Sequence, residues 1–324
     1  MRTTRGKPTY DRVLLGDRQL AEAMADALAL EERRDRYTHG FHAYPAGLHP
    51  DAARDLVALF PGESVLDPFC GGGTVLVEAI AAGRRAVGRD LSTTALRVAR
   101  ARTCVGDEAF LTRVRSRARK LTAEAREATE LPPHQILQGT EEWYAPYVLC
   151  ELESLRRGIQ ESDEDLKPIL WALFSTLLVK VSWRRSDTSA QRVKHHRPPG
   201  TAAILFHKKA REYGRQVASF RDAVPEGTPA ADVRAGDARN IQGAGAVDLV
   251  LTSPPYPATY DYLPLQHLRR IWFGENRRED DQEIGARRSG VPVVSKRGVN
   301  GRARRPSGRP RLRIVSRLAG IWWS

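Results

Sequence analysis

The chain has 324 residues, of which 41% are hydrophobic and 28% are charged. This length can bury one large core or two smaller ones, and every apolar run is shorter than the roughly 18 residues of a membrane span, so we expect no membrane partner. The formal net charge of +13 favours a polyanionic partner, because Lys and Arg neutralise phosphates irrespective of sequence.

The positive charge is unevenly distributed along the chain. Residues 287–324 hold ten Arg and one Lys with no Asp or Glu, so the rest of the chain is nearly balanced. Charge by itself therefore does not distinguish a nucleic-acid-binding protein from one that is merely rich in Arg.

The cysteines and the N-terminus bear on the compartment. Cys70, Cys104 and Cys150 have neither metal-ligand spacing nor the pattern of a disulfide framework. The first residues are charged and are not followed by the apolar segment of a secretory signal. We therefore expect a cytoplasmic protein that binds no metal.

The first expected elements are two helices separated by an aromatic loop. Residues 18–34 carry apolar side chains at helical spacing and predict an accessory helix that packs on the main domain. Residues 37–50 are rich in aromatic, His and turn residues, and form either a packed surface loop or a loop beside a cofactor. Residues 50–60 predict an amphipathic helix.

The strongest local signal is a strand, a glycine loop and a helix in succession. A short apolar strand ends in Asp67, and Pro68-Phe69-Cys70-Gly71-Gly72-Gly73-Thr74 follows. The glycines allow the backbone to approach a ligand and to turn sharply into a helix over residues 75–82. A second strand, residues 85–91, places Asp90 where an α/β nucleotide-binding unit positions a carboxylate for ribose hydroxyls.

This loop differs from the two common phosphate-binding loops. It lacks the full G-x-G-x-x-G of a dinucleotide site, and the Lys-Ser or Lys-Thr of a P-loop does not follow it. A ligand that has a ribose but no pyrophosphate therefore fits better than a dinucleotide.

Residues 104–225 are expected to be mostly helical and charged, with a buried helix within 165–183. A basic loop flanked by an aromatic residue follows, and it is either a contact to a phosphate backbone or a solvated surface. The candidate nucleic-acid residues in it are Arg184, Arg185, Arg192, Lys194 and Arg197.

An alternation of strands and loops resumes at residue 231. A short strand over residues 233–236 ends at Asp237, and an apolar strand over residues 247–251 leads into Thr252-Ser253-Pro254-Pro255-Tyr256. Prolines cannot donate to a sheet ladder, and they fix the backbone just past the strand. The motif predicts a rigid turn with one aromatic ring, which suits a flat ring that carries an amine.

The pattern of elements breaks down in the basic segment 287–324. Only residues 291–294 and 312–315 read as short strands there. We interpret this segment as a truncated or frame-shifted end, which would leave the sheet incomplete at its C-terminus and the chain poorly stable or inactive. A basic arm that binds DNA is the alternative.

Two motifs, in this order and strand context, resemble those of the S-adenosylmethionine-dependent amino-methyltransferases, which modify exocyclic amines of DNA bases. Residues 67–74 resemble the cofactor motif D-P-F-x-G-x-G-T, and residues 253–256 resemble the catalytic motif [D/N/S]-P-P-[Y/F/W], whose serine form is typical of the cytosine-N4 branch. The resemblance covers residues 38–103 and 231–274. It implies an α/β fold with a Rossmann-like methyltransferase sheet and a helical insertion.

The resemblance also implies which residues bind S-adenosylmethionine. Asp67 would lie near its amino group, Asp90 would bind the ribose hydroxyls and Asp237 would accept the adenine amine. The expected cofactor residues, which also border the methionine and pack on the adenine, are Tyr44, Asp67, Phe69, Gly71, Gly73, Thr74, Asp90, Leu91 and Asp237.

The expected catalytic residues are Ser253, Pro254, Pro255 and Tyr256. Ser253 and the Pro254 carbonyl would hold the target amine, and Tyr256 would stack on the base. Two such acceptors would free the amine lone pair, so that positioning supplies much of the catalysis. A base in a duplex must be flipped out of its stack to reach this turn.

The implied function is site-specific methylation of cytosine N4 in DNA within restriction-modification, with a cognate restriction endonuclease as a further partner. Adenine-N6 methylation, guanine-N2 methylation of transfer RNA, and an inactive remnant that binds nucleic acid stay open as alternatives. The chain then divides into an N-terminal accessory helix (1–36), a cofactor-binding half (37–103), a helical insertion for target recognition (104–230), a catalytic half (231–286) and the basic tail (287–324).

Overall fold

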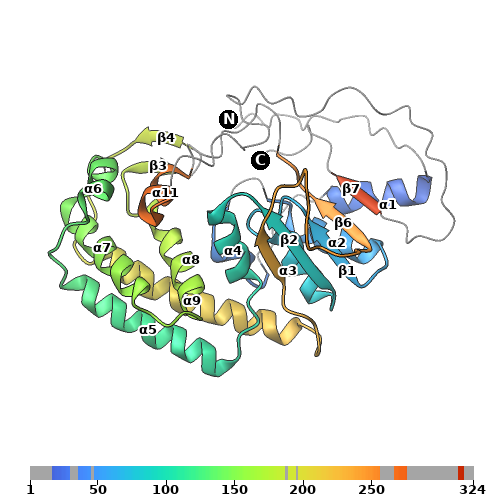
Figure 1. The fold of residues 1–324 in the computed structure, drawn as a ribbon, viewed down its shortest axis with the longest axis horizontal. Coiled ribbons are helices and arrows are strands. Elements are labelled where there is room, and N and C mark those ends of the chain that lie inside the picture. Colours follow the sequence, from blue (N-terminus) through green and yellow to red (C-terminus); the bar gives the residue numbers. More distant parts are fainter. Residues whose placement is uncertain are drawn as a thin grey trace, which may run out of the picture.

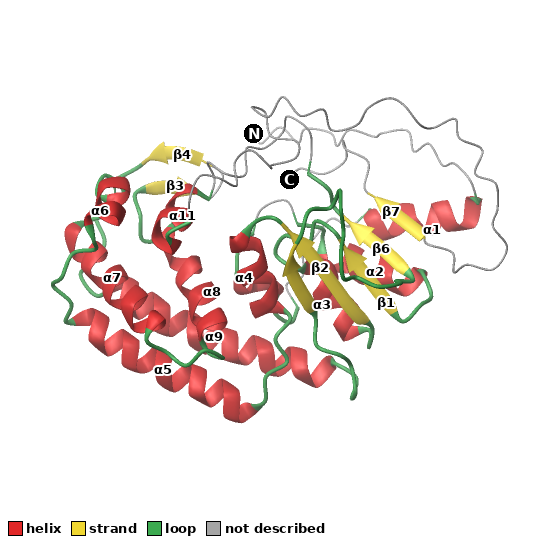
Figure 2. Ribbon diagram, in the orientation of Figure 1, coloured by secondary structure: helices red, strands yellow, loops and turns green. Residues whose placement is uncertain are grey.

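A computed structural model describes residues 17–29, 36–44, 47–186, 189–194, 196–255, 266–275 and 313–316. Figure 1 shows two parts, a parallel sheet with its helices and a block of longer helices beside it. Figure 2 shows the same division, with the sheet strands gathered at one end and the helices of the block at the other.

The sheet has five strands in the order β5-β2-β1-β6-β7, and every neighbouring pair is parallel. The strand order reverses between β1 and β6, so the carboxyl ends of these strands frame the crevice in which open parallel sheets bind ligands. The strands are β1 (Ser64–Asp67), β2 (Arg85–Asp90), β5 (Asp232–Ala235), β6 (Leu249–Thr252) and β7 (Arg313–Ser316).

These strands confirm the expected α/β fold. Each lies within two residues of a predicted strand, and the one predicted at 312–315 corresponds to β7, which pairs with β6 along its whole length. The basic segment therefore contributes a strand to the sheet. The other strand predicted in it, 291–294, lies outside the described residues.

Four helices accompany the sheet. Helix α3 packs on β1 and β2, α4 packs on β2 and β5, and α1 packs on α2. The Ser92 hydroxyl accepts a hydrogen bond of 3.2 Å from the amide of Ala95 and so caps the first turn of α4. The helices are α1 (Arg18–Leu28), α2 (Pro50–Leu59), α3 (Thr74–Ala81) and α4 (Thr93–Arg102).

The helical block has its own hydrophobic core, to which α5, α7, α8, α9 and α11 all contribute. Helix α11 follows the proline motif in sequence, yet its Trp272 is 1% exposed and packs edge-on against Phe174 of α8 at an interplanar angle of 78°. The elements are α5 (Glu108–Arg126), α6 (His134–Thr140), α7 (Pro146–Gln160), α8 (Lys167–Leu178), β3 (Arg184–Ser186), β4 (Ser189–Arg192), α9 (Thr201–Ala223) and α11 (His267–Phe273).

The two parts are joined at α4 and at the short helix η1 (His39–Phe41). The Tyr213 hydroxyl of α9 donates a hydrogen bond of 3.0 Å to the Ala101 carbonyl, and its ring lies 4.9 Å from that of Phe41. On α4, Arg97 lies over the ring of Phe273 at 4.1 Å and pairs with Glu275. The chain on both sides of the proline motif is thus anchored, by β6 before it and by α11 after it.

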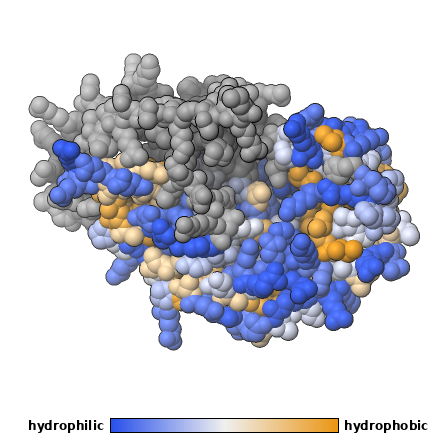
Figure 3. Space-filling view, turned by 180° about the vertical axis from the view of Figure 1, so that it is seen from behind, coloured by the Kyte–Doolittle hydropathy of each residue, from blue (hydrophilic) through white to orange (hydrophobic). Residues whose placement is uncertain are grey.

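One face of the described residues is mostly polar. Figure 3 shows a largely hydrophilic face, with small and separate apolar areas. No helix among the described residues is long and apolar enough to span a membrane. The same residues contain no group of three or more His, Cys, Asp or Glu side chains arranged to hold a metal ion.

Candidate active site

The glycine loop makes a tight turn at the carboxyl end of β1. Gly71 and Gly73 have positive φ angles of 48° and 81°, which side chains rarely adopt. A Cβ atom on Gly72 would lie 2.9 Å from both the Tyr44 side chain and the Arg102 guanidinium. The loop is therefore packed so closely that these positions require glycine.

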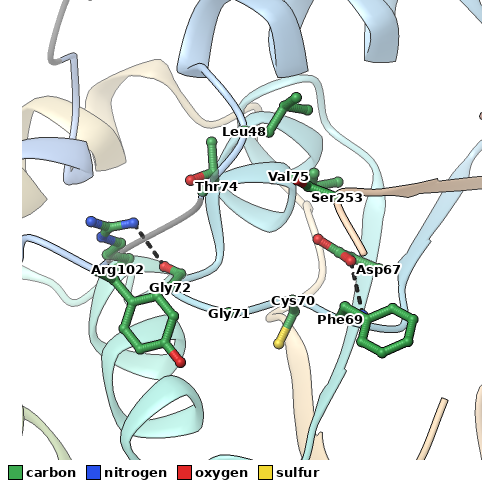
Figure 4. A pocket seen from close by; sticks show the side chains of 12 residues that line it. Leu48, Asp67, Phe69, Cys70, Gly71, Gly72, Thr74, Val75, Arg102 and Ser253 are labelled. Atoms are coloured by element: carbon green, nitrogen blue, oxygen red, sulfur yellow. Dashed lines mark hydrogen bonds between the residues drawn. The ribbon is translucent and has the colours of Figure 1, made fainter. Parts of the chain in front are cut away.

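A pocket opens between this loop and the end of β6. Figure 4 shows Asp67, Phe69 and Ser253 on one side of the loop and Arg102 on the other. The pocket is lined by Tyr44, Gly47, Leu48, Asp67, Phe69, Cys70, Gly71, Gly72, Thr74, Val75, Arg102 and Ser253.

Asp67 is a buried carboxylate, 3% exposed, in the wall of this pocket. Its Oδ1 accepts hydrogen bonds from the Thr252 hydroxyl at 2.7 Å and from the Phe69 amide at 3.1 Å. No Lys or Arg of the described residues forms an ion pair with it. Burial raises the pKa of Asp67 to about 7 against the opposing effect of these hydrogen bonds.

Ser253 contributes the second polar group of the pocket. Its Oγ is buried and has no hydrogen-bond partner within the part of the chain that the structure describes. A buried hydroxyl without a partner is costly, so a ligand in the pocket that donates or accepts a hydrogen bond would be favoured there.

Asp90 lies next to the pocket and is already engaged by backbone amides. Its Oδ2 accepts from the Gly71 amide and its Oδ1 from the Ser92 amide, each at 2.8 Å. Burial raises the pKa of this carboxyl group, and these hydrogen bonds oppose the shift. Asp90 thereby ties β2 to the glycine loop.

Arg102 is a residue of the pocket that the sequence did not single out. It is 3% exposed, and its guanidinium donates to the carbonyls of Gly72 and His39, each at 3.0 Å, and to that of His42. It joins the glycine loop to the segment that carries Tyr44. In the sequence it is one of two Arg residues in the last turn of α4, and nothing in the sequence indicates that it is buried.

The structure brings together six of the predicted cofactor and catalytic residues. Tyr44, Asp67, Phe69, Gly71, Thr74 and Ser253 all line the pocket. Asp237 does not line it: its carboxylate pairs with Arg239 in the loop after β5, and this hydrogen bonding lowers its pKa. Of the remaining predicted positions, Gly73 and Pro254 adjoin pocket residues in sequence without lining the pocket, and Asp90, Leu91 and Pro255 do not line it either. Tyr256 lies outside the described residues.

The predicted nucleic-acid residues lie in and after the β3–β4 hairpin, but they differ in exposure. Arg184 is 5% exposed and donates to the Ser189 carbonyl across the hairpin at 2.9 Å, so it stabilises the hairpin itself. Arg192 and Lys194 are exposed, and their charges lie 5.1 and 5.2 Å from the centre of the Trp183 ring. Arg185 is exposed and bonds to Gln191, and Arg197 is half-buried.

The fold and the pocket together define a class of protein. A parallel sheet with a glycine loop after β1, an acid at the end of β2, and a polar pocket at the β1/β6 switch point is typical of Rossmann-like methyltransferases. Residues 37–137 match the family described as "RMKL-like, methyltransferase domain", a range that contains the glycine loop and Asp90.

A relative of this chain is the type II methyltransferase M.MvaI of Kocuria varians. The two are 25% identical over 264 residues, which cover 73% of this chain and 57% of the relative. The chain thus spans little more than half of the length of that relative. Both similarities support a place for this chain among the S-adenosylmethionine-dependent methyltransferases.

Proposed function

We propose that this protein transfers a methyl group from S-adenosylmethionine to the exocyclic N4 of cytosine in DNA. The observation that carries the proposal is the Ser253 hydroxyl, a buried oxygen without a partner among the described residues, in the same pocket as the glycine loop and Asp67. It lies one residue beyond the end of β6, at the switch point of the sheet.

The residues of the pocket fit the cofactor. The unpaired Asp67 carboxylate suits the ammonium group of the methionine moiety, because a buried negative charge is stabilised by an opposite charge nearby. Gly71 and Gly72 line the pocket beside it, and Asp90 at the end of β2 suits the ribose hydroxyls. When bound, S-adenosylmethionine supplies an activated methyl group.

Ser253 and the adjoining carbonyl of Pro254 suit the amine that accepts the methyl group. An exocyclic amine of a base is a poor nucleophile, because its lone pair is shared with the ring. Acceptors directed at its hydrogens localise the lone pair on nitrogen, and holding the amine still removes much of the entropic cost of the reaction. A neutral serine does this without adding a further buried carboxylate to Asp67 and Asp90.

DNA is the proposed substrate for two reasons. The relative from Kocuria varians is named a type II methyltransferase, and exposed basic residues accompany Trp183 on the β3–β4 hairpin. Base flipping would bring the target to the pocket. A cognate restriction endonuclease stays a prediction from the resemblance.

The test is mass spectrometry of nucleosides from unmethylated DNA incubated with the full chain and S-adenosylmethionine. N4-methylcytosine is the expected product. N6-methyladenine would move the proposal to adenine, and methylated guanine in transfer RNA but not in DNA would move it to RNA. Absence of any product together with absence of cofactor binding in calorimetry would support the inactive remnant.

Ser253→Ala tests the role of the hydroxyl. We expect methylation to fall by about 100-fold or more, as for loss of one hydrogen bond made in a transition state, with cofactor affinity within a few-fold of the original. Ser162→Ala is the matched control, because Ser162 follows α7 and its buried hydroxyl donates to the Gly158 carbonyl within that helix. Its loss should leave methylation unchanged. Parallel losses in both variants would contradict the proposed role.

A further inference from the structure

Thr252 has a contact that the proposed function does not use. It is the last residue of β6, directly before Ser253, and its hydroxyl donates to Asp67 Oδ1 across the switch point at 2.7 Å. Both side chains are buried, with 7% of Thr252 and 3% of Asp67 exposed. The strand that presents the acceptor side of the pocket is therefore bonded to the carboxylate on its cofactor side.

The charge of Asp67 depends on few groups. The Thr252 hydroxyl and the Phe69 amide favour the ionised form, while burial and the nearby Asp90 disfavour it. No cation of the described residues pairs with Asp67, although its carboxylate lines the pocket. A cationic group of a ligand could therefore serve as the counter-ion of Asp67.

We propose that Thr252 is a positioning residue of the cofactor site, whose hydroxyl holds the Asp67 carboxylate ionised and oriented toward the ammonium group of the cofactor. The proposal rests on the proposed function and adds to it a coupling between cofactor binding and a proton. The cofactor binds the ionised carboxylate. Protein molecules in which Asp67 is protonated before binding therefore release this proton when the cofactor binds.

The other ionisable groups near Asp67 do not replace this role. Cys70 of the glycine loop has a pKa raised by burial and stays a neutral thiol. Arg102 of α4 directs its guanidinium at backbone carbonyls, and Tyr44 packs against the glycines. Asp90 is a like charge that opposes ionisation of Asp67.

The direction of the pH effect follows from the hydrogen bond. Thr252 lowers the pKa of Asp67, so its loss moves the ionisation to higher pH. Cofactor affinity rises with pH through the ionisation of Asp67 and levels off above it. Loss of one hydrogen bond to a charged group is expected to move this rise up by about one pH unit.

The experiment is calorimetric titration of the full chain with S-adenosylhomocysteine, which carries the same amino-acid moiety, between pH 6 and pH 9. Thr252→Val removes the hydroxyl and keeps the shape, Thr252→Ser restores the hydroxyl, and Thr140→Val removes a comparably buried hydroxyl that bonds within α6. The ionisation of the ligand's own groups affects all four proteins equally. Differences in pH dependence between the proteins therefore report on ionisation in the protein.

We expect Thr252→Val to bind about tenfold more weakly than the parent at pH 6 and equally at pH 9, with Thr252→Ser and Thr140→Val close to the parent throughout. Repeating the parent titration at pH 6.5 in buffers of different ionisation enthalpy should detect proton release on binding. A Thr252→Val defect of equal size at every pH, or binding without proton release, would overturn the proposal. No binding by the parent at any pH would instead overturn the proposed function.

Discussion

Asp67 contributes in opposite directions to stability and to binding. Its pKa is raised from 3.8 to about 7 in the folded chain, so the folded state holds a proton that the unfolded state releases. Stability therefore falls as pH rises from about 4 to about 7. Above pH 7 the full cost of the buried charge is present.

Asp67→Asn should separate the two contributions. The amide oxygen can keep the hydrogen bonds from Thr252 and Phe69, while the buried charge is lost. In urea unfolding at pH 8 without ligand, we expect the free energy of unfolding of this variant to exceed that of the parent by about 2–4 kcal/mol, and by less at pH 5. We also expect the variant to lose cofactor binding.

Asp248→Asn is the control for that substitution, and we expect it to change stability in the opposite direction. Asp248 accepts three hydrogen bonds from Ser64 and Glu63, and the Ser64 hydroxyl contributes most to its lowered pKa. Its neutralisation should destabilise the chain at pH 8. Destabilisation by Asp67→Asn at that pH would contradict the assignment of an uncompensated charge.

Arg102 is expected to contribute more to stability than Arg100, which lies on the same helix. Arg102→Met leaves three buried carbonyls without their donor and should lower the free energy of unfolding by about 2–4 kcal/mol. Arg100→Met is the matched control, since Arg100 is exposed and bonds to the single carbonyl of Val233. Chemical denaturation of both variants measures the difference, and equal losses would show that burial of Arg102 is not what matters.

At the scale of elements, the β3–β4 hairpin is the part of the helical block best suited to a phosphate backbone. The double substitution Arg192→Gln with Lys194→Gln removes the two exposed charges beside Trp183. We expect weaker DNA binding at low salt and a plot of log affinity against log salt that is less steep by about 2. Fluorescence anisotropy with labelled duplex DNA measures both quantities.

The control for the hairpin carries the same change of charge elsewhere. Arg119 and Lys120 are exposed on α5, and their replacement by Gln should leave the salt dependence unchanged. An equal effect of the two double variants would mean that the hairpin contributes to DNA binding only through the general positive charge of the surface. Arg184→Gln, in contrast, should mainly loosen the hairpin, because Arg184 is buried within it.

The elements themselves were predictable where local sequence determines them. The glycine loop, α4 and the strands follow from apolar runs, glycine and the Ser92 cap, all of which act over a few residues. The packing of α11 on the helical block was not predictable from the sequence, because Trp272 contacts Phe174, which is almost a hundred residues away in the chain. The same holds for the bond from Thr252 to Asp67, since only the pairing of β1 with β6 brings them together.

For the whole molecule, the sheet and the helical block form one frame around the pocket. Helix α4 carries Arg102 in the pocket, Arg97 against α11, and a face packed on α8. Helix α4 therefore contributes to the hydrophobic core of the helical block and to the core beneath the sheet, and it also borders the candidate site. Displacement of α4 relative to either core would alter the glycine loop, since Arg102 bonds directly to the Gly72 carbonyl.

The charge of the molecule is concentrated where the sequence suggested a DNA-binding arm. Residues 287–324 hold ten Arg and one Lys without any acid, so they supply nearly all of the net charge of +13. Replacing Arg302, Arg304, Arg305 and Arg309 with Gln should weaken DNA binding irrespective of sequence, because counterion release depends on the number of phosphates neutralised. The four positions precede β7 and so leave its sequence intact.

We expect the salt dependence of that variant to be less steep by up to about 4, with the methylated base and cofactor affinity unchanged. Anisotropy across a range of salt concentrations measures the first, and nucleoside mass spectrometry with calorimetry measures the others. An unchanged salt dependence would mean that these arginines do not contact DNA. A changed methylated base would instead mean that they contribute to target recognition, since backbone contacts carry no sequence information of their own.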